Sequence, residues 1–122
     1  MPEKKETVLT VEEAKNLVTA IGPSLGCGDF TYEPVFPKNR KDIAAVRRMA
    51  ENGYSYGFDT IYLVWKDKFG VIKYDELINS RSTKDYIHIE EIIVEEQVAV
   101  VKIGSGGSYS GSAWNKTITR TI

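Results

Sequence analysis

The sequence predicts an α+β fold in which two N-terminal helices pack on one face of an antiparallel sheet of four to five strands. Apolar side chains recur at helical spacing in the first part of the chain, whereas from Tyr54 onward they follow the patterns of strands. Because the helices precede the strands and do not alternate with them, a parallel βαβ sheet is not expected. The 122 residues show no internal repeat, so we expect one domain over 1–122, with 1–9 extended or frayed.

The first helix is expected in the stretch TVEEAKNLVTAIGP, which begins at residue 10. Thr10 is a favourable N-cap, and Glu13 stands three residues later as its capping-box partner. Gly22 and Pro23 end the helix. Its buried stripe consists of Val11, Ala14, Leu17, Val18 and Ile21.

The second helix is expected from Arg40 to Asn52, after a segment whose glycines and two X-Pro steps oppose regular structure over much of its length. Asn39 or Asp42 is suited to its N-cap, and Gly53 is well placed at its C-terminal end. Its buried stripe consists of Ile43, Val46, Met49 and Ala50.

The strands are expected in the second half of the chain. Residues 59–67 are apolar on both faces, which is typical of a central strand, and a turn at 67–70 leads into a hairpin strand at 71–78. A third strand at 85–96 is expected to carry a bulge at Glu90–Glu91, where the apolar alternation slips. A turn at 95–97 then leads to a strand at 97–104, and 115–122 forms the last strand.

Composition excludes several classes of protein. The 16 basic and 17 acidic residues nearly balance, so the chain has no general attraction to nucleic acid or to anionic membranes. Cys27 is the single cysteine, which excludes an internal disulfide and a cysteine-based zinc site within one chain. We see no signal peptide and no membrane span, and expect a cytoplasmic protein with no metal and no cofactor.

The segment 104–115 is the leading candidate for function. Gly104 and Gly106 begin a dinucleotide-binding pattern, but its third glycine position holds Tyr109 and a strand follows, so no helix N-terminus faces a phosphate. Two alternatives remain: the glycines and serines are typical of a mobile connection between strands, and the same residues together with aromatic ones are typical of adaptable recognition loops. We therefore expect a non-enzymatic binding or protein-interaction module with a protein or small-molecule partner. The contact residues would be Gly106, Ser108, Tyr109 and Trp114, although Trp114 could instead pack in the core.

A small enzyme is the first alternative. Cys27 lies between glycines and His88 is the only histidine, so the two could form a nucleophile and its base. Against this, His88 lies mid-strand on the face opposite Ile87 and Ile89, where the pattern favours a solvent-facing or hydrogen-bonded structural histidine.

Nucleic-acid binding is the second alternative, through the basic face of the expected second helix. The residues involved would be Arg40, Lys41, Arg47 and Arg48, followed by Tyr54 and Tyr56 for base stacking. The near-neutral chain makes this alternative less favoured than the binding module. Separately, Thr117–Ile122 lacks proline and carries one charge, Arg120, so an edge position would suit it to pairing in a homodimer.

Overall fold

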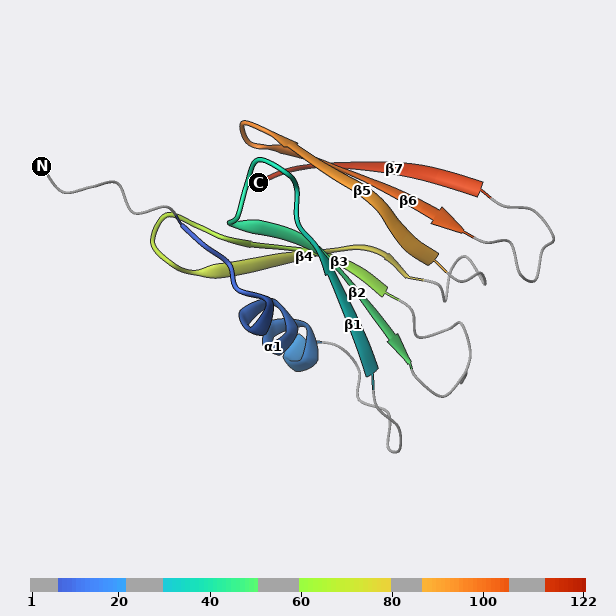
Figure 1. The fold of residues 1–122 in the computed structure, drawn as a ribbon, viewed down its shortest axis with the longest axis horizontal. Coiled ribbons are helices and arrows are strands. Elements are labelled where there is room, and N and C mark those ends of the chain that lie inside the picture. Colours follow the sequence, from blue (N-terminus) through green and yellow to red (C-terminus); the bar gives the residue numbers. More distant parts are fainter. Residues whose placement is uncertain (1–6, 22–29, 51–59, 80–86, 106–113) are drawn as a thin grey trace, which may run out of the picture.

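The computed structural model describes residues 7–21, 30–50, 60–79, 87–105 and 114–122. Within them the chain forms one helix and seven strands, arranged in three layers (Figure 1). In chain order these elements are α1 (Val11–Ile21), β1 (Phe30–Val35), β2 (Ile43–Ala50), β3 (Thr60–Lys66), β4 (Ile72–Asn79), β5 (Ile87–Glu95), β6 (Val98–Ser105) and β7 (Trp114–Thr121).

The strands form two antiparallel sheets. The first sheet has the order β1-β2-β3-β4 and the second has the order β5-β6-β7. Figure 1 shows α1 on one side of the first sheet and the second sheet on its other side. The first sheet is therefore the middle layer, and the second sheet packs on one face only.

Two apolar clusters hold the layers together. β2 contributes to both clusters, because Ile43 and Ala45 face the second sheet whereas Ala44 and Val46 face the helix. The buried cluster between the sheets comprises Ile43, Ala45, Ile61, Leu63, Leu77, Ile78, Ile87, Ile92, Val94, Ala99, Val101, Ile103 and Ile118. The cluster under the helix comprises Leu9, Ala14, Val18, Ala44, Val46, Tyr62 and Val64.

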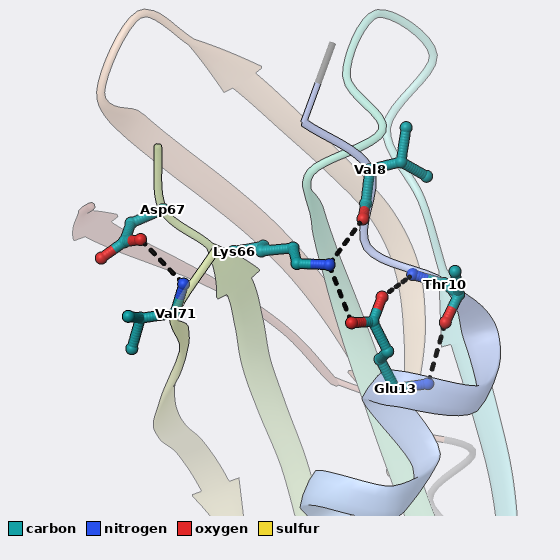
Figure 2. Close-up of polar contacts among 6 residues, drawn as sticks. All are labelled: Val8, Thr10, Glu13, Lys66, Asp67 and Val71. Atoms are coloured by element: carbon teal, nitrogen blue, oxygen red, sulfur yellow. Dashed lines mark hydrogen bonds and ion pairs between the residues drawn. The ribbon is translucent and has the colours of Figure 1, made fainter. Parts of the chain in front are cut away.

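The first helix is confirmed together with its capping box (Figure 2). The amide of Glu13 donates to the Thr10 hydroxyl at 3.0 Å, and the amide of Thr10 donates to the Glu13 carboxylate at 2.9 Å. Lys66 at the end of β3 donates from Nζ to Glu13 Oε2 at 2.8 Å and to the Val8 carbonyl at 3.3 Å. The Lys66 hydrogen bond, followed by that of the Thr10 amide, lowers the pKa of Glu13.

The expected fold class is wrong, because the second helix does not exist. Residues 43–50 form β2, which pairs with β1 over 45–50 and with β3 over 43–48. A strand covered on both faces is apolar at successive positions, and a short run of that kind also fits one turn of a helix. The three alanines of β2 have high helix propensity, but tertiary burial between two layers decides the conformation.

A second correction concerns β1, which lies where irregular structure was expected. Its Pro34 lacks an amide donor, but β1 is at the edge of the first sheet, where a proline is tolerated. The single sheet of four to five strands is thereby replaced by two sheets of four and three strands.

The strands expected in the second half are confirmed. β3 is central, and the turn after it is closed by Asp67, whose carboxylate accepts from the amides of Phe69 and Val71 at 2.9 Å each. Gly70 adopts φ 83°, a conformation that favours glycine. The register of β5 against β6 shifts between Ile89 and Glu91, where the bulge was expected.

Candidate binding surface on the second sheet

The outer face of the second sheet, turned away from the first sheet, is not covered by any described helix or strand. Its inner face supplies Ile92, Val101 and Ile118 to the core, so the alternate residues point outward. The register places the outward residues in four rows across β5, β6 and β7. These rows are Glu95–Val98–Thr121, Ile93–Val100–Thr119, Glu91–Lys102–Thr117 and His88–Gly104–Asn115.

A hollow of about 670 Å³ lies on this face at the β5–β6 turn. It is lined by Ile93, Glu95, Glu96, Val98 and Val100. Val98 is 39% exposed, whereas the inner-face residues beside it in β6 are almost fully buried. The lining thus combines three apolar side chains with two carboxylates, and none of the five residues is basic.

The turn that carries Glu96 has an unusual backbone. Glu96 adopts φ 54° and is the only described residue other than glycine with a positive φ. A side chain with a Cβ adopts this conformation at a cost of roughly 1–2 kcal/mol. In a two-residue hairpin turn this position is usually glycine, so the surrounding structure must hold the turn in place.

Residues outside the second sheet anchor this turn. Arg40, in the β1–β2 connection, donates from Nη1 to the Glu96 carbonyl at 3.0 Å, and the Ile122 amide donates to the Gln97 carbonyl at 2.7 Å. Arg40 is itself oriented by two hydrogen bonds to the Asp42 carboxylate, at 2.8 and 2.7 Å. Arg40 lowers the pKa of Asp42 through this hydrogen bonding. The turn is therefore preorganised by contacts that do not occupy the hollow.

Acidic side chains continue along β5. A second hollow, of about 340 Å³, lies between β5 and the β1–β2 connection; its lining residues include Glu90, Glu91 and Glu95. Glu91 forms an ion pair with Lys102 at 3.4 Å. With Glu96, four glutamates thus follow β5 and its turn, against Lys38 in the lining of the second hollow and Lys102 beside Glu91.

His88 and Glu90 converge at the far end of the same face. A Cβ added at Gly104 would lie 2.8 Å from His88 Nε2 and 2.7 Å from Glu90 Oε1. The absence of a side chain at Gly104 therefore lets both groups lie across β6. His88 is exposed, as its alternation with the buried Ile87 predicted.

The sequence-predicted recognition residues are not placed by the structure. Gly106, Ser108 and Tyr109 lie outside the described residues, and for Trp114 only the backbone is described, paired with Ser105. Their segment nevertheless joins β6 to β7 and so begins and ends in the second sheet. Cys27 also lies outside the described residues, so its pairing with His88 stays a hypothesis.

The expected basic helix face is wrong, because its residues lie in a strand and its preceding loop. Arg47 and Arg48 are neighbours in β2 and point to opposite faces of the first sheet. Arg47 forms an ion pair with Glu33 at 3.3 Å, while Arg48 is 2% exposed and hydrogen-bonds Tyr62. Lys41 and Arg40 precede the strand, and Tyr54 and Tyr56 lie outside the described residues.

Tyr62 is buried on the helix side of the first sheet together with the polar residues Arg48 and Thr60. Burial raises its pKa, the charge of Glu76 raises it further, and Arg48 acts in the opposite direction. Both Tyr62 and Arg48 are almost completely inaccessible, so this pair belongs to the interior of the fold and not to a surface site.

Sequence reasoning missed the hollow at the β5–β6 turn. The sequence does carry a signal of this hollow, because strand alternation places the apolar Ile93, Val98 and Val100 on the same face as charged residues. Without a known partner layer, however, alternation alone does not say which face is covered. The class of structure is a two-sheet antiparallel sandwich with one helix on the first sheet.

Comparison of the chain with protein-family models, curated proteins and solved structures gives no match. Among the described residues, no group of three or more His, Cys, Asp or Glu side chains is placed to hold a metal ion. Within the same residues, no helix has the length and apolar character needed to cross a membrane.

Proposed function

We propose that the protein is a binding module that takes a positively charged segment of a partner protein on the outer face of its second sheet. The observation that carries this proposal is the hollow lined by Ile93, Val98, Val100 and two glutamates. An apolar side chain of the partner would enter the hollow, and lysine or arginine residues beside it would meet Glu95 and Glu96.

Apolar burial supplies the favourable part of this binding. The free energy gained is roughly 25 cal/mol for each Å² of apolar surface removed from water. The carboxylates select among partners, since an acidic segment would meet like charge along β5. Exposed ion pairs contribute little affinity, about 0–1 kcal/mol each, so charge governs the choice of partner more than the strength of binding.

The surface is suited to recognition because it is held rigidly. The residues of the hollow lie on two paired strands and on a turn anchored by Arg40 and by the Ile122 amide. A surface that is already in its binding conformation loses less conformational entropy on association.

Fluorescence anisotropy with a labelled peptide of alternating lysine and leucine tests the proposal. The combined substitution Glu95→Gln and Glu96→Gln should weaken binding about five- to tenfold, from the loss of two exposed ion pairs. Val100→Ser should weaken it further by removing apolar surface. Glu12→Gln, an exposed charge on α1, is the control and should leave the affinity unchanged.

Two matched peptides distinguish specific binding from general attraction. Replacing the lysines by glutamate, or the leucines by serine, should abolish measurable binding. Equal loss of affinity with Glu12→Gln and with the Glu95 and Glu96 substitutions would show that only net charge matters, and would overturn the proposal.

The Gly/Ser/aromatic segment is tested in the same assay. It joins β6 and β7 at the end of the second sheet opposite to the hollow. If recognition extends to it, Tyr109→Ala and Trp114→Ala should each reduce affinity for the peptide while the unfolding midpoint stays close to that of the wild type. An unchanged affinity would confine recognition to the hollow.

A further inference from the structure

The four edge strands of the two sheets differ in how well they resist pairing with another chain. An unprotected edge presents free backbone donors and acceptors, which proteins usually block with prolines, bulges or charges. β1 carries Pro34, and β5 is bulged between Ile89 and Glu91. β4 is irregular against β3 and presents Lys73, Asp75 and Glu76 within eight residues.

β7 has neither a proline nor a bulge. It pairs with β6 over eight residues without a register shift, and it contains no proline. Four of its residues, Thr117, Ile118, Thr119 and Thr121, are β-branched and favour extended backbone. Its two charged residues, Lys116 and Arg120, lie on the same face of the strand as Ile118. Arg120 donates from Nε to the carboxylate of Asp75 in β4 at 2.6 Å.

We propose that two copies of the chain pair antiparallel through β7 and join their second sheets into one six-stranded sheet. A two-fold axis normal to the sheet passes through a residue that lies opposite itself in the partner. An axis at Ile118 would place Lys116 opposite Arg120 of the other copy, and like charges directly opposite each other are destabilising.

An axis at Thr119 avoids this conflict. Thr119 then lies opposite its own copy, and Thr117 lies opposite Thr121 in both directions. All three threonines are exposed on the outer face, so the dimer gains three cross-strand threonine pairs. On the inner side, Arg120 lies opposite Ile118. The chain's own β7 is therefore a partner of suitable length and charge for this edge.

The dimer does not depend on the proposed peptide surface. The hollow lies on β5, β6 and their turn, whereas the dimer would form at the outer edge of β7, although Thr119 of β7 is paired with Val100, which lines the hollow. The peptide assay therefore reports on the hollow, and the oligomeric state reports on β7, so either proposal can fail alone.

Sedimentation velocity from micromolar to submillimolar protein tests the dimer. Thr119→Lys and Thr119→Glu each place like charges at the two-fold axis, so each should raise the dimer dissociation constant by at least about tenfold. An equimolar mixture of the two variants brings opposite charges together and should restore the dimer. Glu12→Lys, at an exposed residue of α1, is the control and should dimerise like the wild type.

Amide hydrogen exchange of the wild type supplies a readout that needs no variant. The amides of β7 should become more protected as the protein concentration rises, whereas those of β4 should not change. A wild type that stays monomeric at submillimolar concentration would overturn the proposal. So would a dimer that withstands both Thr119 substitutions.

Discussion

The strained turn at Glu96 allows backbone conformation and side-chain function to be separated by two substitutions. Glu96→Gly removes the Cβ at φ 54° and should relieve roughly 1–2 kcal/mol. The greater freedom of glycine in the unfolded chain costs about 0.5–1 kcal/mol of that gain. We therefore expect the free energy of unfolding to rise by about 0.5–1 kcal/mol, which for a chain of this length corresponds to about 2–4 °C in Tm.

Urea unfolding of Glu96→Gly and Glu96→Ala gives the comparison. Both lose the carboxylate, but Glu96→Ala keeps the Cβ and its strain, so it should remain within about 0.5 kcal/mol of the wild type. Both substitutions should weaken binding of the lysine–leucine peptide by the same factor. Gln97→Gly, at a residue without positive φ, should only destabilise. The strain argument is refuted if Glu96→Gly is no more stable than Glu96→Ala.

Three further outcomes are expected. Gly104→Ala should change stability by less than about 1 kcal/mol, because flexible side chains give way to the added methyl group, yet it should shift the imidazole resonances of His88 in NMR spectra. Lys66 lowers the pKa of Glu13 from 4.5, so the ionised Glu13 stabilises the folded state above pH 4.5 and this stabilisation is lost as the pH falls through the lowered pKa. In urea unfolding, the difference in free energy of unfolding between the wild type and Glu13→Gln should therefore shrink in acid. Arg40→Met should cost about 1–3 kcal/mol in urea unfolding and speed amide exchange at the β5–β6 turn, because the Glu96 carbonyl loses a charged donor.

The parts of the fold that could be predicted are those decided by neighbouring residues. The α1 capping box needs only Thr10 and Glu13, and the hairpin after β3 needs only Asp67 and Gly70. The bulge in β5 could be recognised because one extra residue shifts the apolar alternation. Each of these features has a local cause, and each is confirmed.

The second helix was mispredicted because its sequence satisfies two structures. Ile43 and Val46 lie at helical spacing, and they are also alternate-face residues of a strand buried on both sides. Which structure forms depends on whether there is a layer above and below, and the sequence of β2 does not contain that information. The preceding β1 was overlooked for a related reason, since Pro34 suggests a loop until the strand is known to be an edge.

The site could be predicted only in part. Sequence reasoning placed function in the connection between β6 and β7, which belongs to the second sheet, and it identified His88 as an outward-facing residue. It did not find the hollow, because the apolar residues that line it alternate like core residues, and alternation does not say which face of a strand another layer covers. The Arg40 contact that anchors the adjacent turn joins residues more than fifty positions apart and leaves no local pattern.

The layer order explains why both proposals concern the second sheet. The first sheet is covered by α1 on part of one face and by the second sheet on the other, so the side chains of β2 and β3 are largely committed to the interior, whereas Tyr74 of β4 is 48% exposed. The second sheet keeps one open face and one regular edge. If its edge pairs β7 with β7, two hollows are held on one rigid sheet, and a partner with two basic segments binds the second at high effective concentration. Because Thr119 is paired with Val100 of the hollow, Thr119→Lys also affects each single site, so the measure is the ratio of the affinity for a bivalent peptide to the affinity for a monovalent one. This ratio should be higher for the wild type than for Thr119→Lys.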